Sequence, residues 1–233
     1  MTPAPRGSYR GTYTALAIFL VVAIIASMCI GAFMFTPAHI AHFVAQQAGW
    51  AATIGGDTLD RNVFFQLRLP RVLIAGLTGA VLGVSGTLMQ GLFRNPIVEP
   101  GLAGTSAGAA LGAALVFVLG ANTIVSFTTL VGAFAVPLLA FAGAFTATLI
   151  VYRISASFGK VNVFTLLLAG IAINAVCAAG TGFLSYIARD PQARNITFWN
   201  LGTFTTADWR SVSIVAPAFV VCFFWVVRYG KAL

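Results

Sequence analysis

The residues whose side chains could carry out chemistry are few, and they do not form a complete reactive set. The two histidines, His39 and His42, lie three positions apart. On a helix they would face the same way and could contact a metal ion or the edge of a haem, although the same spacing fits an amphipathic turn at a membrane interface. An enzyme would need His, Asp or Glu clustered near one face, and the sequence shows no such cluster. We therefore predict no catalytic residue and no metal site.

The composition is that of a chain surrounded by lipid. Of the 233 residues, 59% are hydrophobic and 8% are charged, and the mean hydropathy is +0.95. A soluble domain carries about 25% charged residues, so this chain could not cover a surface that faces water. The net charge of +8 is then attributed to membrane topology, because no basic run is interleaved with aromatic residues. We expect the lipid bilayer as a partner and no nucleic acid.

Charged residues and turns divide the apolar sequence into segments long enough to cross a bilayer, which takes about 20 residues. Such segments must be helices, because lipid offers no partner for free backbone groups. The fold class is therefore all-α, a polytopic membrane helix bundle. The predicted spans are residues 14–35, 71–93, 102–119, 125–152, 163–186 and 211–227. The fourth is long and contains Pro137, which predicts a kink or a tilt.

The basic residues orient these spans with both ends of the chain in the cytoplasm. The inner segments then carry seven Lys and Arg residues and the outer segments six, and both lysines and the short loops fall inside. The outer segments are long. Residues 36–69 include HIAHFVAQQ, which could form a short interfacial helix, and residues 188–210 contain two tryptophans typical of the interface.

No charged side chain lies in the middle of a span, so whatever drives this protein acts from outside the bilayer. The amides Gln90 and Asn174 are the polar groups that the interior can offer besides hydroxyls and backbone. An ion-coupled secondary transporter is the alternative, and it predicts a buried ionisable residue and inverted repeats. Neither is visible in the sequence. The phosphate-binding pattern G-x-x-x-x-G-K-S/T is also missing, so a nucleotide-driven engine would be another chain.

Glycines recur at four-residue spacing in the second and third spans. Gly79 and Gly83 form one pair, and Gly104, Gly108 and Gly112 form a longer series. Small residues at this spacing allow another helix to approach backbone to backbone. They serve either as helix-packing glycines within the chain or as contacts that let helices shift around a pathway, and the sequence does not separate the two.

One ordered series of motifs resembles a known family. The sequence R-L-P-R at residues 68–71 precedes a glycine-rich helix, then S-G-x-x-x-Q at 85–90 and R-N-P-x-x-x-P-G-L-x-G-x-S-x-G-A from residue 94. L-L-L-A-G at 166–170, W-x-x-G at 199–202 and D-W-R at 208–210 follow in order. Together they resemble the permease subunits of type II ABC importers, which take up ferric siderophores, haem and vitamin B12 in bacteria. The likeness runs from about residue 14 to the end.

The resemblance implies an architecture and partners. Family members have ten helices per subunit, and two permease copies pair around a central path. Two ATPase subunits bind on the cytoplasmic side, and a periplasmic substrate-binding protein docks above. The six predicted spans suggest that residues 1–233 are a single transmembrane permease domain, the amino-terminal portion of a longer permease.

The resemblance also implies a function. The chain is expected to be the permease subunit of an ATP-driven importer in the bacterial inner membrane, with iron or haem transport as its role. The segment NPIVEPGLAGTSAGAALGAAL favours the haem branch, while siderophore and corrinoid cargos stay open. The permease is not expected to be an enzyme or to hold a cofactor of its own, since ATP is used by the partner ATPase.

Two arginines occupy the family's docking positions. Arg68 and Arg71 match the arginines that meet acidic residues on the binding protein. A planar guanidinium suits a carboxylate, and rim charges guide docking. The alternative is that both arginines anchor the end of the helix among lipid headgroups.

The family's cytoplasmic gate has two matching elements. Asn95 and Ile97 lie in the turn that Pro96 forces at the end of the second span. Asn162 and Val163 precede L-L-L-A-G and match the second element more loosely. The alternative is that both are ordinary inner turns.

Overall fold

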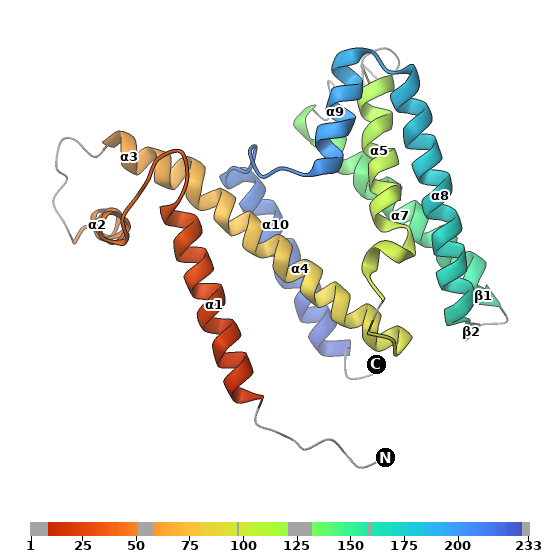
Figure 1. The fold of residues 1–233 in the computed structure, drawn as a ribbon, viewed down its shortest axis with the longest axis horizontal. Coiled ribbons are helices and arrows are strands. Elements are labelled where there is room, and N and C mark those ends of the chain that lie inside the picture. Colours follow the sequence, from red (N-terminus) through yellow and green to blue (C-terminus); the bar gives the residue numbers. More distant parts are fainter. Residues whose placement is uncertain (1–8, 51–57, 97, 121–131, 158–159, 230–233) are drawn as a thin grey trace. The chain divides into compact units, whose positions relative to one another are not determined.

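The structure is a computed structural model that describes residues 9–50, 58–96, 98–120, 132–157 and 160–229. It confirms an all-α fold, with one two-residue antiparallel pair, β1 (Ala156–Ser157) and β2 (Lys160–Val161), as its described strands (Figure 1). The chain forms two compact units. Unit 1 comprises Met1–Val81 and Phe204–Trp225, and unit 2 comprises Leu82–Thr203 and Val226–Leu233.

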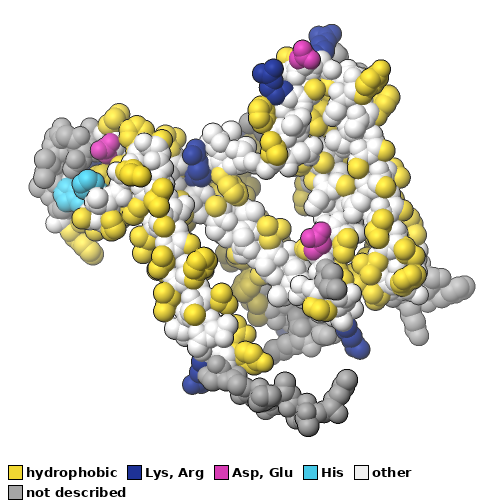
Figure 2. All heavy atoms as spheres, in the orientation of Figure 1, with side chains coloured by type: hydrophobic (Ala, Val, Ile, Leu, Met, Phe, Trp, Pro, Cys, Tyr) yellow, Lys and Arg dark blue, Asp and Glu magenta, His cyan; other side chains and the backbone are white. Residues whose placement is uncertain are grey.

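Six apolar helices occupy the positions of the six predicted spans. Five of them in the described residues are long and apolar enough to cross a membrane: Arg10–Cys29, Leu59–Phe93, Ala135–Ser155, Val163–Ile187 and Trp209–Arg228. The sixth, Thr105–Leu119, is shorter, with 15 residues. Hydrophobic side chains cover the helices, and the few charged side chains in view lie mostly near helix ends (Figure 2). This surface suits contact with lipid.

In unit 1, the first helix is shorter at its end than the sequence suggested. Helix α1 (Arg10–Cys29) ends six residues before the predicted limit at residue 35, so that limit was wrong. Helix α2 (Pro37–Gln47) follows and confirms the short helix expected in the first outer segment. The hydroxyl of Thr36 caps α2 by accepting a hydrogen bond from the backbone N–H of His39 at 3.3 Å, and Pro37 is in the first turn, where its missing N–H costs nothing.

The second span, predicted from residue 71, is part of a much longer helix. Helix α3 (Thr58–Asn62) continues through a π-helical turn, η1 (Val63–Arg68), into α4 (Leu69–Phe93). The helix passes Pro70 because the π turn widens the backbone just before it, and the N–H of Leu69 donates to the carbonyl of Phe64, five residues back. Arg68 and Arg71 therefore lie within a continuous helix.

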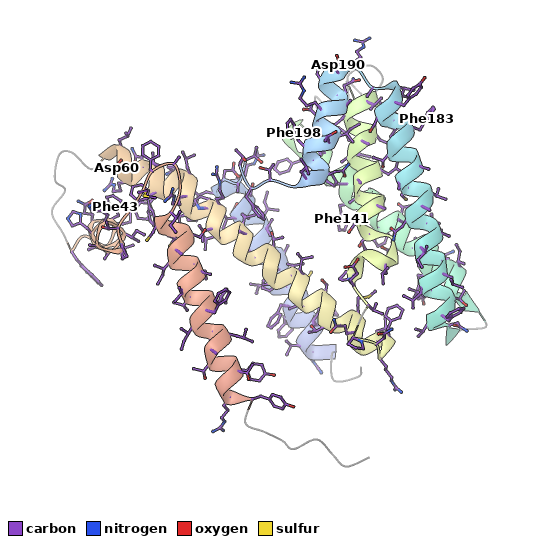
Figure 3. All side chains as sticks on the ribbon, viewed as in Figure 1. Phe43, Asp60, Phe141, Phe183, Asp190 and Phe198 are labelled. Carbon is purple, nitrogen blue, oxygen red and sulfur yellow. The ribbon has the colours of Figure 1, made fainter. Side chains whose placement is uncertain are left out.

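An aromatic cluster holds these elements of unit 1 together. Phe35, Phe43 and Phe64 are buried, and they come from the segment after α1, from α2 and from η1. Phe35 meets the other two rings edge to face, with centroids 5.8 and 6.0 Å apart. Edge-to-face packing of this kind adds about 0.5–1.5 kcal/mol per pair to the burial of apolar area. The cluster thereby fixes α2 against the start of the long helix, and Figure 3 shows Phe43 on α2.

Helix α10 (Trp209–Tyr229) begins at a side-chain cap. The carboxylate of Asp208 accepts hydrogen bonds from the backbone N–H of Ser211 at 2.8 Å and from its hydroxyl at 2.6 Å. These two bonds hold the pKa of Asp208 below its usual value. The helix also contains Pro217 in its interior.

In unit 2, helix α5 (Thr105–Leu119) packs against α7 (Ala135–Ser155) and α8 (Val163–Ile187). The predicted fourth span began at residue 125, but residues 121–131 lie outside the described residues. Within α7, Pro137 lies in the first turn, where no helical hydrogen bond is lost. A kink inside α7 at that proline is therefore not required, and the predicted kink or tilt of the whole span stays a prediction.

The glycines of α5 lie directly on the backbone of α7. A Cβ placed on Gly108 or Gly112 would collide with the carbonyl oxygens of Gly143 and Leu139. Gly104 has φ 87°, which favours glycine, and it separates the 3-10 turn η2 (Pro100–Ala103) from α5. By contrast, a Cβ on Gly79 or Gly83 of α4 would have no described atom within 4 Å. The same spacing thus makes a close helix contact in α5 and leaves α4 open.

Helix α9 (Asp190–Leu201) was not expected, since the sequence suggested a loop there. Its Ile196 is buried with Ala114 and Val118 of α5 and Leu184 of α8. The amide oxygen of Gln192 accepts from the N–H of Arg189 at 2.9 Å, which closes the start of the helix. Asp190 marks this start in Figure 3.

We expect Gly112→Val to destabilise the protein and Gly79→Val to leave it nearly unchanged. Overpacking costs about 1–3 kcal/mol, and the α7 backbone opposite Gly112 cannot move aside as a side chain could. Thermal unfolding in detergent measures this. The two variants introduce the same side chain into a helix, so an equal loss for both would contradict the α5–α7 contact.

Candidate functional site

Arg68 closes the end of α1. Its Nη1 donates to the carbonyl of Met28 at 2.9 Å, and the centre of its guanidinium lies 5.0 Å from the centroid of the Phe35 ring. A Cβ on Gly31 would collide with this guanidinium, so the glycine leaves room for it. Carbonyls in the last turn of a helix lack helical partners and favour a cation. Arg68 supplies a hydrogen-bond donor and a positive charge to this last turn, and its side chain is half-buried.

Arg71 holds the segment that precedes α10. Its Nε donates to the carbonyl of Phe204 and its Nη2 to the carbonyl of Thr205, both at 3.1 Å. The planar fork of a guanidinium suits two neighbouring acceptors, which lysine could not bind in this way. Arg71 is exposed. The structure thus places both predicted docking arginines in unit 1, where each already bonds to backbone.

A further side-chain to backbone hydrogen bond in unit 1 was not predicted from the sequence. The indole Nε1 of Trp209 donates to the carbonyl of Phe65 at 2.8 Å. In the π-helical register this carbonyl would bond to residue 70, but Pro70 has no N–H to give. Trp209 therefore satisfies a carbonyl that the proline leaves open. The D-W-R motif contained this signal, but nothing in it indicates which carbonyl the indole would reach.

The predicted gate residues that are described lie in unit 2. Arg94 has φ 50°, and the N–H of Asn95 donates to the carbonyl of Gln90 at 3.2 Å, so the chain turns sharply after α4. The amide of Gln90 also donates to the carbonyl of Pro96 at 3.1 Å. Ile97 lies outside the described residues.

The second gate element is the start of α8. The side-chain oxygen of Asn162 accepts from the N–H groups of Phe164 at 2.9 Å and Thr165 at 3.2 Å, so Asn162 caps the helix that Val163 begins. A buried cluster includes Phe93 and Val98, on either side of the Asn95 turn, together with Leu166 of α8. The two predicted gate elements therefore border one core.

Between the Asn95 turn and α5, the described residues contain the 3-10 turn η2 and no α-helix. The carbonyl of Leu102 approaches Gly170 of α8 so closely that a Cβ there would collide with it. The amide nitrogen of Asn174 donates to the carbonyl of Gly101 at 3.0 Å, while the buried Oδ1 of Asn174 has no partner among the described residues. Irregular backbone inside a membrane protein requires such internal partners. The role of Asn174 is thus to support the start of α5.

The histidines lie on α2, in the cyan patch of Figure 2. His39 is exposed and its ring centroid lies 6.4 Å from that of Phe43. In the described part of the chain, no group of three or more His, Cys, Asp or Glu side chains is placed to hold a metal ion. The pair stays without an assigned role.

The order of these elements matches one family over most of the chain. A model of the FecCD transport family matches residues 19–233. The chain belongs to the FecCD transport family. The family and the apolar helices together make this FecCD protein a multi-pass protein of the bacterial inner membrane.

Relatives of this FecCD protein include three permeases. It is 40% identical to the hemin transport system permease protein of Yersinia pestis over 158 residues, which cover 66% of this chain and 45% of that one. It is 31% identical to a vitamin B12 import system permease protein of Escherichia coli, over 94% of this chain and 59% of the relative. It is 29% identical to the molybdate import system permease protein of Haemophilus influenzae, over 92% of this chain and 60% of the relative.

A solved structure supports the fold of the FecCD chain. It is described as an inward-facing conformation of a metal-chelate type ABC transporter, and it aligns with a TM-score of 0.70 at 26% identity over 95% of this chain and 62% of the other. The FecCD chain thus spans between 45% and 62% of the length of these relatives. These relatives are transport components.

We expect Trp209→Phe to lower the stability of this FecCD protein by about 0.5–1.5 kcal/mol, because the carbonyl of Phe65 loses its donor while most of the apolar ring is kept. Thermal unfolding in detergent measures the loss. Trp50→Phe is the control, since Trp50 is 86% exposed. If both variants unfold at the wild-type temperature, the indole bond does not support unit 1.

Proposed function

We propose that the chain is the membrane-embedded permease portion of an ATP-driven importer that carries haem or a related iron complex across the bacterial inner membrane. The observation that carries this proposal is the match of residues 19–233 to the FecCD transport family, together with 40% identity to a hemin permease. Ferric siderophores and corrinoids are the other cargos of this proposal.

The preference for haem rests on the relatives. Identity to the hemin permease is 40%, against 31% and 29% to the vitamin B12 and molybdate permeases. The higher identity extends over 158 residues, against 218 and 216 for the other two. The three named cargos differ widely in chemistry, so the family alone does not select among them.

The positions of charged residues in the helices favour an energy source on a separate chain. In the described apolar helices, Asp, Glu, Lys and Arg lie near the ends, except for Arg68 and Arg71 in the first half of the long helix Leu59–Phe93. Helix α8 contains none of them. A proton or ion relay needs an ionisable group near the midplane. The proposal therefore assigns ATP hydrolysis to two ATPase subunits on the cytoplasmic side, with a second permease copy completing the pathway and a periplasmic binding protein delivering cargo.

Docking of the binding protein is proposed at Arg68 and Arg71, on the family match. The geometry favours Arg71 as the docking contact, because it is exposed, whereas Arg68 is half-buried over Phe35. The gate is proposed at Asn95, Ile97, Asn162 and Val163. Its support is the shared core of Phe93, Val98 and Leu166, through which a shift of the Asn95 turn would reach the start of α8.

Transport is expected to require ATP hydrolysis by the partner chain. The test reconstitutes the complete permease in liposomes with its binding protein and measures haem uptake with the active ATPase, with a hydrolysis-deficient ATPase and without ATPase. We expect uptake in the first case alone, because the described spans offer no ionisable relay. Uptake driven by a proton gradient without the ATPase would favour the secondary transporter.

Reversal of both arginines, Arg68→Glu with Arg71→Glu, is expected to weaken binding-protein association more at low salt than at high salt. Exposed charges act over about 8–10 Å at ordinary ionic strength, and a single rim pair contributes about 0.2–1 kcal/mol. Binding of the partner to the purified complex is measured as a salt series.

Two controls separate docking from loss of structure. The double change to Gln removes the charge without placing acid against acid, so it should show a smaller salt dependence. Arg153→Glu changes the charge at the last turn of α7, on the predicted inner side. A folded double reversal with unchanged on-rate at low salt would show that docking lies elsewhere.

A further inference from the structure

A cavity of about 420 Å³ lies beside the two arginines of unit 1. Its wall is formed by the end of α1 and the segment after it, by the first half of the long helix and by Phe204, whose carbonyl accepts a hydrogen bond from Arg71. The apolar lining includes Ile30, Phe33, Leu67, Val72, Ala75 and Phe204, and the charged lining is Arg68 and Arg71. Pockets of this size, mostly apolar with a few convergent polar groups, are typical of ligand sites.

The charges of the cavity are not balanced by the described residues. Arg68 bonds to the carbonyl of Met28, and Arg71 bonds to the carbonyls of Phe204 and Thr205. A guanidinium has five N–H groups, so both side chains keep donors beyond these bonds. No carboxylate in the described part of the chain is paired with either one. Two positive groups beside an apolar cavity, held in place by backbone bonds, favour an anion.

The rim of the cavity indicates where that anion comes from. The exposed fractions of Ile30, Leu67 and Phe33 are 66%, 55% and 48%. Ile30 and Phe33 follow the last residue of α1, and Leu67 lies on η1 of the long helix. We infer that this exposed apolar rim opens toward the bilayer near its headgroup level, because apolar side chains favour lipid over water. A free phosphate has no apolar part that would cover this rim. A phospholipid supplies a negative headgroup and apolar chains in one molecule.

We propose that this cavity binds an anionic phospholipid. Its phosphate interacts with Arg68 and Arg71, and the first carbons of its acyl chains pack on Ile30, Phe33 and Leu67. Because Arg68 holds the end of α1 and Arg71 holds the segment before α10, the lipid would stabilise the ends of both helices against α4. The proposal does not rest on the cargo or on the docking of a binding protein.

The test measures lipid binding to the purified complete complex by native mass spectrometry. The probes are phosphatidylglycerol, phosphatidylcholine with the same acyl chains, and inorganic phosphate. We expect the wild type to bind phosphatidylglycerol at least about tenfold more tightly than phosphatidylcholine, as charge-assisted hydrogen bonds to two arginines imply. Inorganic phosphate should not compete, because it lacks the apolar chains.

Two kinds of variant probe the two halves of the site. The double change Arg68→Gln with Arg71→Gln should abolish the preference for phosphatidylglycerol. Ala75→Phe fills the cavity without changing a charge and should weaken binding of phosphatidylglycerol, since Ala75 lines the cavity. Ala80→Phe is its control, because Ala80 is exposed on the same helix and does not line the cavity.

Each outcome decides the proposal. A tenfold preference that disappears in the Gln variant and falls in Ala75→Phe but not in Ala80→Phe would support it. Equal binding of the two lipids by the wild type would overturn it, and so would a preference that the folded Ala75→Phe protein retains in full. If inorganic phosphate displaces the lipid, the site binds a simple anion. If the Gln variant loses binding-protein affinity but keeps its lipid preference, the arginines serve docking only.

Discussion

Lipid offers no hydrogen-bond partner, so each backbone N–H and C=O of a membrane protein must be satisfied within the protein or at its edges. Regular helices meet this demand along most of the chain. Where the helices end or distort, side chains from distant segments take over. Arg68 bonds to the carbonyl of Met28, Trp209 to that of Phe65, and Asn174 to that of Gly101. The first two ties organise unit 1 and the third supports the start of α5 in unit 2.

The need to satisfy backbone carbonyls also explains why Arg68 and Arg71 lie within a helix and not in a loop. A guanidinium has enough donors to close a helix end or a loop and still interact with an external anion. Arg68 and Arg71 are therefore structural residues as well as candidates for binding, and a mutation that removes either one changes both properties. A substitution at Ala75 that fills the neighbouring cavity changes no charge, so it separates binding in the cavity from the structural role of the arginines.

Unit 2 contains both the close backbone contacts between helices and the residues of the proposed gate. Gly108 and Gly112 bring α5 onto the backbone of α7, and Gly170 does the same for the segment before α5. Close contacts of this kind leave few side chains to rearrange when a helix shifts. The turn at Asn95 and the cap at Asn162 border the core of this unit, which agrees with a gate built on a rigid support.

The sequence by itself determined the fold class, the positions of six apolar helices and the family, because long charge-free runs have only one regular structure available in lipid and because the motifs keep their order. It did not determine where α1 ends, that the long helix continues through Pro70, or that α9 exists. Those features depend on groups far along the chain: Arg68 at the end of α1, Trp209 at Phe65, and the side of α5 on which Ile196 packs. Glycine spacing likewise predicted that another helix could approach both α4 and α5 backbone to backbone. Only the tertiary structure shows that α7 lies against Gly112, while no described atom lies within 4 Å of a Cβ at Gly79. A local pattern states what a helix face can accept, whereas the packing of the whole chain decides what lies opposite it.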